Sequence, residues 1–229
     1  MKGLIFVGGL QYSGKSHFCR DLAAKYPDRY AHLEADSILE KLHAEPSAFH
    51  DLMRRYDERF HYHLVQLAIS NGLNDKGAQL AFFTQVANQH PKLREGYENI
   101  INECVIAYMA ELLLAAMPGQ IPLVDGLFTA KTTRKATYGL IANWVQGKID
   151  LDSVNKMMLY FDLGLKISLE RYRAQKRDSS KALQWDESLI RRTHANQEVP
   201  TENELPNCKI EIVRNAISLE ARINTYFSF

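Results

Sequence analysis

Residues 4–16 read LIFVGGLQYSGKS, and the order of residue types in this stretch decides the fold. Residues 4–7 are wholly apolar and lie between glycines, which is typical of a short strand that is buried on both faces. From residue 15 to residue 26 apolar side chains recur at helical spacing, and Pro27 ends the pattern. The stretch therefore predicts a strand, a glycine turn and a helix at the start of the chain.

Four further apolar runs are predicted to be strands, and each is followed by a helical pattern. The predicted strands cover residues 30–33, 121–124, 156–161 and 209–213. Helices are predicted to begin at residue 37 and to cover residues 132–146, the segment around residues 171–177, and residues 218–226. Strands that alternate with helices form a parallel sheet with helices on both faces. The sequence thus predicts a three-layer α/β fold around a five-stranded parallel sheet.

A long helical region, residues 46–117, separates the second and third predicted strands and is interpreted as an insertion in a single domain of residues 1–229. It holds helical segments at residues 49–69 and 97–117, with a break at residues 71–77 (NGLNDKG). The first segment is either a surface for a nucleotide or phosphorylated acceptor, or a solvated face with Tyr56, Phe60 and Tyr62 packed inward. Its basic side chains are His50, Arg54, Arg55, Arg59, His61 and His63. Interspersed acids favour the solvated face, and the i,i+2 spacing of the last two histidines disfavours a shared metal ion.

The composition sets limits on the class of protein. At 229 residues the chain can bury a core without disulfides, and its formal net charge of +1 gives no support to bulk attraction for nucleic acid or membranes. The three cysteines form no CxxC pair, so neither a disulfide framework nor a zinc site is indicated. The short apolar N-terminus does not resemble a signal peptide, and no run approaches the roughly 18 apolar residues of a membrane span. We therefore expect a cytoplasmic protein with reduced thiols and no membrane partner.

Residues 9–16, GLQYSGKS, match the phosphate-loop pattern GxxxxGK[ST] at every fixed position. Glycines allow backbone N–H groups to curl around phosphate oxygens, and the helix that follows adds the positive end of its dipole. Lys15 is expected to reach the β- and γ-phosphates, and Ser16 to bind Mg²⁺. The residues predicted to hold the nucleotide here are Gly9, Tyr12, Ser13, Gly14, Lys15, Ser16 and His17.

The class of phosphate-loop protein is narrowed by motifs that the sequence lacks. A GTPase usually carries an NKxD tetrapeptide and a transporter ATPase an LSGGQ-like signature, and neither is present. A helicase would be longer, because it needs a second motor domain. These observations favour a compact kinase, in which catalysis consists mainly of positioning and charge stabilisation.

A carboxylate follows the second predicted strand, in the segment HLEADS at residues 32–37. The carboxyl ends of parallel strands form the edge at which open sheets bind ligands. Asp36 is therefore a candidate base that takes the proton of an attacking hydroxyl, with Glu34 a weaker candidate. The alternative is that Asp36 or Ser37 caps the next helix, and the two roles are compatible.

A second carboxylate, Asp125, ends the third predicted strand in the segment IPLVDG at residues 121–126. A strand-end acid beside a phosphate loop orients Mg²⁺ or its water ligands, and Gly126 permits close approach of the backbone to a ligand. The alternative is a solvated aspartate in a turn.

Basic residues cluster in the segment LERYRAQKR at residues 169–177. Arg173 and Arg177 are one helical turn apart and share a face, and Arg171 and Lys176 add to the cluster. A lid of about residues 171–185 could close these arginines over the transferring phosphoryl group and exclude water. The alternative is a solvated basic helix face.

These segments resemble the family of small phosphate-loop (P-loop) kinases that includes polynucleotide kinase, zeta toxins and chloramphenicol phosphotransferase. The matching pieces are GLQYSGKS, HLEADSI, IPLVDGLF, LERYRAQKR and WDESLIRRTHANQEVP, so that the resemblance covers about residues 3–42 and 120–226. It implies the three-layer P-loop NTPase fold with strand order 2-3-1-4-5, Mg-ATP as donor, Asp36 as base and lid arginines on the phosphates. It further implies that Arg134 holds the acceptor or organises its site, and that the loop after the fifth predicted strand lies near the adenine. There Arg214 or Asn215 either touches the base or serves only as part of the turn. Tyr12 and the long insertion depart from the family.

The leading hypothesis is a Mg-ATP-dependent phosphotransferase that moves the γ-phosphoryl group to a hydroxyl. The acceptor stays open among a small molecule such as a sugar, nucleoside or antibiotic, a nucleotide sugar as for zeta toxins, and a nucleic-acid end, to which the net charge lends no support. A regulatory P-loop protein that binds ATP without a small acceptor is the alternative from another class.

Overall fold

The computed structural model describes residues 3–126, 128–175, 187–215 and 218–227. Its centre is an all-parallel sheet of five strands in the order β2-β3-β1-β4-β5. The strands are β1 (Leu4–Gly9), β2 (Tyr30–Glu34), β3 (Ile121–Asp125), β4 (Lys156–Phe161) and β5 (Cys208–Val213). The predicted parallel sheet is confirmed, and its order is the one that the resemblance implied.

The described residues form ten α-helices. These are α1 (Lys15–Lys25), α2 (Ala35–Ala44), α3 (Pro46–Tyr56), α4 (Glu58–Ser70), α5 (Lys76–Gln89), α6 (Pro91–Ala116), α7 (Lys131–Val145), α8 (Leu165–Gln175), α9 (Glu187–Ala195) and α10 (Leu219–Tyr226), with a short 3₁₀ helix at Leu151–Ser153. The predicted helix at 49–69 is in fact two helices, because Asp57 is extended and its carboxylate caps α4 by accepting from the Phe60 amide at 2.9 Å. The sequence did not predict α5.

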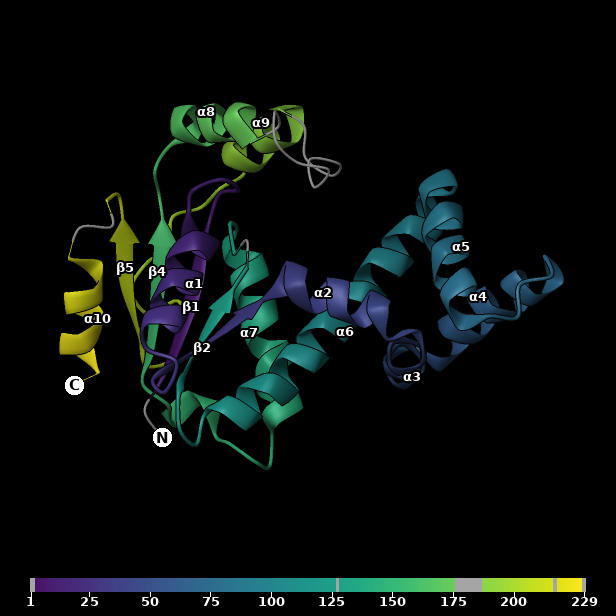
Figure 1. The fold of residues 1–229 in the computed structure, drawn as a ribbon, viewed down its shortest axis with the longest axis horizontal. Coiled ribbons are helices and arrows are strands. Elements are labelled where there is room, and N and C mark those ends of the chain that lie inside the picture. The colour runs from purple at the N-terminus through teal and green to yellow at the C-terminus, as the bar shows by residue number, and fades with distance from the viewer. Residues whose placement is uncertain (1–2, 127, 176–186, 216–217, 228–229) are drawn as a thin grey trace. The chain divides into compact units, whose positions relative to one another are not determined.

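In the unit that contains it, the sheet is the middle one of three layers, with helices on both of its faces (Figure 1). On one face, Val7 of β1 and Leu159 of β4 pack in a buried cluster with Leu22 of α1 and Ile223 of α10. On the other face, the ring of Phe6 contacts Tyr138 of α7 at 6.1 Å between centroids. The central strands β1, β3 and β4 are buried along their whole length, whereas β2 and β5 at the edges are partly exposed. Burial on both faces explains why the central strands are apolar throughout.

The chain divides into two compact units, Met1–Glu34 with Leu112–Phe229, and Ala35–Glu111. The predicted insertion at residues 46–117 lies largely within the second unit, which also contains α2. In that unit α3, α4 and α5 pack on one another around buried side chains that include Phe49, Met53 and Phe83.

The histidine-rich segment of this second unit agrees with the predicted solvated face in part: Arg54, Arg55, Arg59 and His63 are exposed. His50 is buried; its Nε2 donates to the Lys76 carbonyl at 3.2 Å, and its Nδ1 lies 2.9 Å from Nε2 of His61. Tyr56 and Tyr62 are exposed, so the expectation that they pack inward is wrong. Because Asp57 separates α3 from α4, the residues before and after it do not belong to one continuous helical face.

Helix α6 is relevant to the expectation that the chain has no membrane partner, which the structure does not test. No unbroken apolar run is present, but residues 93–116 as a whole are long and apolar enough to cross a membrane by length and composition. Half of the most apolar window is buried inside the structure. A core helix of a folded protein passes the same test, so the finding alone is weak evidence for a membrane span.

Candidate functional site

The glycine turn connects the end of β1 to the start of α1, as the sequence predicted. Its backbone has positive φ at Gly9 (131°), Tyr12 (60°) and Gly14 (91°). A Cβ atom on Gly9 would lie 2.5 Å from the carbonyl oxygen of Phe161 in β4, so this position requires glycine both for its φ and for its space. Tyr12 adopts a left-handed conformation that bulky residues seldom take.

The first turn of α1 offers backbone donors and a cation. Phe18 is the first residue whose N–H bonds back into the helix, to the Gly14 carbonyl at 3.0 Å, and no side chain caps this end. The N–H groups of the residues before it, Lys15 and Ser16 among them, therefore have no intrahelical acceptor. Lys15 is 8% exposed, and the described residues give its ammonium no hydrogen bond or ion pair. Such an end attracts anions, phosphate in particular.

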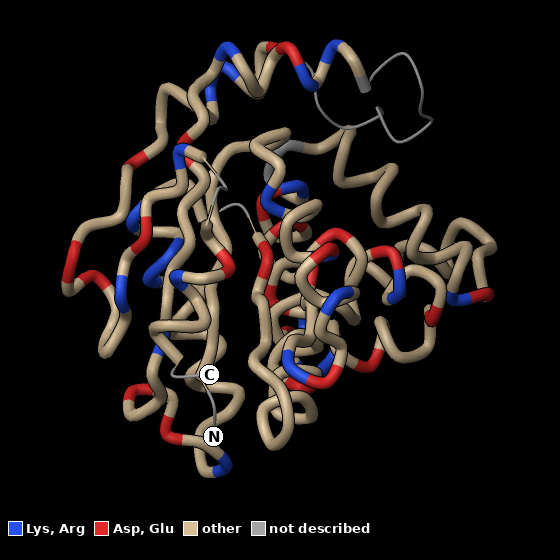
Figure 2. The backbone as a smooth tube through the Cα atoms, turned by 60° about the vertical axis from the view of Figure 1, so that its left-hand side comes forward, with Lys and Arg blue, Asp and Glu red and all other residues tan. Residues whose placement is uncertain are grey.

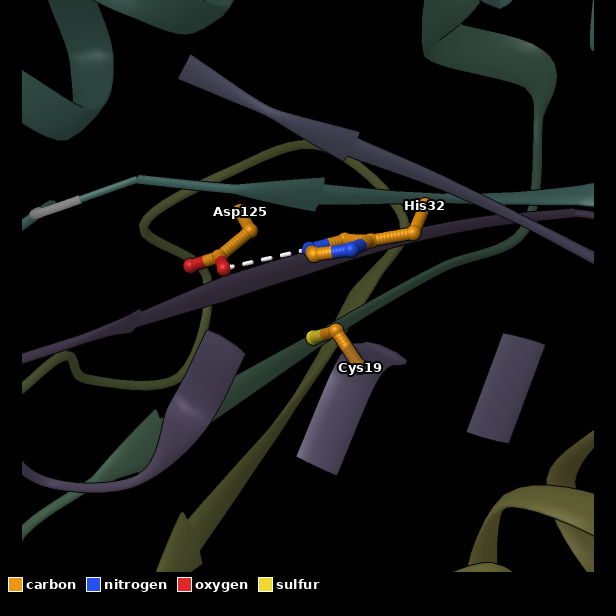
Figure 3. A group of neighbouring side chains, drawn as sticks. All are labelled: Cys19, His32 and Asp125. Atoms are coloured by element: carbon orange, nitrogen blue, oxygen red, sulfur yellow. Dashed lines mark hydrogen bonds and ion pairs between the residues drawn. The ribbon is translucent and has the colours of Figure 1, made fainter. Parts of the chain in front are cut away.

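Asp125 lies beside this turn at the end of β3. It pairs in register with Val7 of β1 and with Glu34 of β2, and the Gly126 N–H donates to the Val7 carbonyl at 3.1 Å. The aspartate is 2% exposed, so the interpretation as a solvated turn residue is wrong. Its Oδ2 accepts a hydrogen bond from Nε2 of His32 at 3.2 Å, while its Oδ1 is buried without a partner in the described part of the chain (Figure 3).

Two residues of the turn also carry buried polar atoms without partners among the described residues: Ser13, at its hydroxyl, and Gln11, at both atoms of its amide. A buried polar group with no hydrogen bond costs about 1–3 kcal/mol, so native proteins rarely leave several together. Together with the free oxygen of Asp125 and the cation of Lys15, these atoms fit a magnesium–phosphate group, which supplies both acceptors and a cation.

Cys19 of α1 completes a compact group with His32 and Asp125. Its Sγ, a ring nitrogen of the histidine and a carboxylate oxygen all lie within 4.8 Å of one another (Figure 3). Burial, and then the charge of Asp125, raise the pKa of the Cys19 thiol well above its usual value, and Lys15 opposes this shift. In the structure as it stands the thiol is therefore protonated.

The arginine that contacts the turn is Arg171 of α8. Its Nη1 donates to the carbonyl oxygens of Ser13 at 2.8 Å and of Tyr12 at 3.3 Å. The ring of Tyr172 packs edge-on against that of Tyr12, with centroids 5.3 Å apart. In a trans peptide the C=O and N–H point in opposite directions, so the N–H of Gly14 faces away from Arg171. The arginine thus fixes the orientation of a loop peptide.

The other predicted lid arginines are placed differently. Arg173 is exposed and forms a two-point ion pair with Glu187 of α9, at 2.7 and 2.9 Å. Residues 176–186 are not described, so Arg177 and the part of the predicted lid after residue 175 lie outside the described residues. Figure 2 shows that basic residues predominate along α8 and α9, and Figure 1 shows these helices beyond the carboxyl ends of β4 and β5. The basic residues are Lys166, Arg171, Arg173, Arg191 and Arg192.

The surroundings of Arg134 contradict one of the two roles that the resemblance implied for it, contact with the acceptor. Its side chain is 0% exposed and forms a two-point ion pair with Glu204, and its Nη1 also donates to the Glu198 carbonyl at 2.7 Å and the Phe128 carbonyl at 3.0 Å. A saturated, buried guanidinium cannot contact an acceptor in this structure. The second suggestion fits better, because Arg134 ties the segment after β3 to the segment after α9.

Of three further predicted residues, two are exposed in the first unit and one belongs to the second unit. His17 is exposed and pairs with Asp21 at 3.2 Å. Arg214 follows β5 and lies 3.9 Å from Asp162, which follows β4. Asp36 belongs to the second unit, two residues beyond Glu34 at the end of β2. Helix α2 begins at Ala35, so neither Asp36 nor Ser37 is its N-cap; Asp36 lies inside the first turn.

Sequence reasoning missed the roles of His32, Cys19 and Gln11. For His32 and Cys19 the sequence offers only their positions as a signal. His32 lies in a predicted strand, next to Leu33, and Cys19 lies one helical turn after Lys15. No protein-family model matches the chain, and a search of curated proteins finds no match. The functional argument therefore depends on the residues of the site.

Proposed function

We propose that the protein is a cytoplasmic, magnesium-dependent P-loop kinase that transfers the γ-phosphoryl group of ATP to a hydroxyl. The observation that carries this proposal is the junction of the glycine turn with Asp125. A helix N-terminus, a buried lysine and a buried carboxylate with one free oxygen meet at the carboxyl edge of the parallel sheet. This is the edge at which such sheets bind nucleotides.

Each group has a distinct task in this proposal. Lys15 and the amides at the start of α1 bind the phosphate oxygens, and Ser16 and Asp125 would hold Mg²⁺. The metal ion, when bound, neutralises charge on the phosphates. His32 keeps the Asp125 carboxylate oriented through its hydrogen bond to Oδ2. Arg171 holds the loop peptides. Arg173 and Arg177 are expected to cap the transferring group, which for Arg173 requires release of its ion pair with Glu187.

The proposal is tested first by nucleotide binding and then by transfer. Purified protein should bind ATP more tightly with Mg²⁺ than with EDTA, as measured by calorimetry. With γ-labelled ATP, label should then pass to an acceptor in one of several pools: sugars, nucleosides, nucleotide sugars, hydroxyl antibiotics or nucleic-acid ends. Magnesium-dependent binding without transfer to any pool would favour the regulatory alternative. No magnesium-dependent binding would refute both.

Asp36 is expected to be the base. With the identified acceptor, Asp36→Asn should lower turnover by roughly 10²-fold, because the amide cannot take the hydroxyl proton. ATP affinity should be unchanged, since the residue acts on the acceptor. Glu34→Gln is the comparison variant, and calorimetry with transfer kinetics is the measurement. Unchanged turnover in Asp36→Asn, or a larger loss in Glu34→Gln, would show the assignment to be wrong.

Arg171 is expected to support nucleotide binding through the turn. Arg171→Gln should weaken the affinity for magnesium–ATP roughly tenfold, since a charged hydrogen bond contributes about 1.5–3 kcal/mol and part of this organises the loop. Lys166→Gln is the matched control, because it removes a positive charge from an exposed position of the same helix. Equal affinities of the two variants would exclude a specific role for the arginine.

A further inference from the structure

Three side chains of different chemical type lie close to one another (Figure 3). Cys19 projects from α1, His32 from β2 and Asp125 from β3, and their ligand atoms lie within 4.8 Å of one another. All three come from regular elements, so their positions do not depend on a flexible loop. No sequence pattern indicates this group, because the three residues are far apart along the chain and no CxxC pair is present.

Thiolate, imidazole and carboxylate are the ligands that zinc takes in proteins, at roughly 2.0–2.3 Å from the ion. At those distances two ligands of a tetrahedral ion are roughly 3.5 Å apart. The observed separations are up to 4.8 Å, so a closure of about 1 Å by side-chain rotation would be enough. Three protein ligands leave a fourth position for water or an anion.

The charges favour a divalent ion in this buried place. A thiolate and a carboxylate that are buried side by side repel each other, and this repulsion is offset when a divalent cation binds between them. A thiolate, a carboxylate and a neutral imidazole around a 2+ ion give no net charge, which lowers the cost of burial. Mg²⁺ prefers oxygen ligands, so the sulfur selects for a softer ion.

We propose that Cys19, His32 and Asp125 form a binding site for a thiophilic divalent cation of the zinc type, and that an ion bound there inhibits the protein by withdrawing Asp125 from Mg²⁺. The inhibitory half rests on the proposed kinase function, because it assumes that Asp125 serves the magnesium–nucleotide complex. The binding half depends only on the three side chains.

Cobalt is the probe for the binding half, because Co²⁺ replaces zinc and gives a thiolate-to-metal charge-transfer band only when a cysteine is a ligand. Nucleotide-free protein is titrated with Co²⁺ and then with Zn²⁺. We expect a band at one equivalent that Zn²⁺ abolishes, in the wild type and in Cys104→Ser/Cys208→Ser. The band should be lost in Cys19→Ser, and His32→Ala should weaken Co²⁺ binding at least about tenfold.

Cobalt bound to other histidines, such as the His50–His61 pair, gives no thiolate band and so does not confuse the result. Circular dichroism checks that each variant is folded. If Cys19→Ser is unfolded, two other results test the site. These are the band at one equivalent of Co²⁺ in Cys104→Ser/Cys208→Ser and the weaker Co²⁺ binding of His32→Ala. No band in the wild type, a band that persists in folded Cys19→Ser, or undiminished binding by His32→Ala would overturn the proposal.

The inhibitory half is tested by calorimetry of magnesium–ATP with and without one equivalent of Zn²⁺. The nucleotide affinity should fall at least tenfold in Cys104→Ser/Cys208→Ser and should not change in Cys19→Ser. Unchanged affinity despite a cobalt band would overturn inhibition while leaving the site. Absence of nucleotide binding in every sample would instead overturn the proposed function, and with it the inhibitory half.

Discussion

Replacing Lys15 with alanine is expected to lower phosphoryl transfer by at least about 10²-fold and to remove most of the magnesium–ATP affinity. In a kinase the protein contributes mainly position and charge, so one preorganised cation at the phosphates accounts for a large part of the rate. Lys15 is buried at the start of α1 and has no hydrogen bond or ion pair among the described residues. Its charge is therefore available to a ligand.

The control for Lys15→Ala is Lys135→Ala, which removes an exposed lysine from α7 in the same unit. Both variants are compared by calorimetry with magnesium–ATP, by transfer of label from γ-labelled ATP, and by thermal unfolding. Equal nucleotide affinity of the two variants would remove the main support for a phosphate site at the turn. A folded Lys15→Ala that still transfers label at the wild-type rate would do the same.

Arg134→Met is expected to lower the free energy of unfolding by about 3–5 kcal/mol, the usual cost of leaving one charge of a buried ion pair alone. The side chains of Arg134 and Glu204 are 0% and 1% exposed, so neither charge can turn to water. The carbonyls of Phe128 and Glu198 would also lose their donor. Urea unfolding followed by circular dichroism is the measurement.

The double variant Arg134→Met/Glu204→Met separates the pair from its surroundings. Removing both charges avoids the unpaired carboxylate, so the double variant should be clearly more stable than Arg134→Met. Arg222→Met, which breaks the more exposed pair of Arg222 with Glu211, should cost much less. A double variant as unstable as the sum of its single variants would show that the two side chains do not act as a pair.

The same pair predicts a dependence of stability on pH. Burial alone would raise the pKa of Glu204, but the hydrogen bonds and charge of Arg134 outweigh it, and the net shift is downward from 4.5. A carboxylate whose pKa is lower in the folded state stabilises that state above its unfolded pKa, and this contribution is lost as the pH falls through the folded value. Unfolding between pH 6 and 3 should therefore show a loss of stability below about pH 4.5 that is smaller in the double variant.

The sheet could be predicted from the sequence because its strands are short apolar runs between turn residues, and β4 was predicted residue for residue. The glycine turn and Asp125 could be predicted because strand, turn and strand-end acid are local patterns. The break at Asp57 could not, because a single extended residue interrupts a pattern that is helical on both sides. Cys19 and His32 come close to each other only when α1 packs on the sheet. That Arg171 rather than Arg173 contacts the glycine turn depends on the direction in which α8 leaves β4.

Gly9 and Gly14 are both in the turn, yet they offer protein engineers different opportunities. A methyl group at Gly9 would meet the rigid backbone of Phe161 at 2.5 Å and force β1 away from β4 at the centre of the sheet. At Gly14 the obstacles are its φ of 91°, which strains any residue other than glycine, and the guanidinium of Arg171 at 2.8 Å, the far end of a flexible side chain. A library screened only for soluble expression would thus already eliminate most changes at Gly9. Variants at Gly14 would survive such a screen more often, and they are the place to look for folded protein with an altered loop.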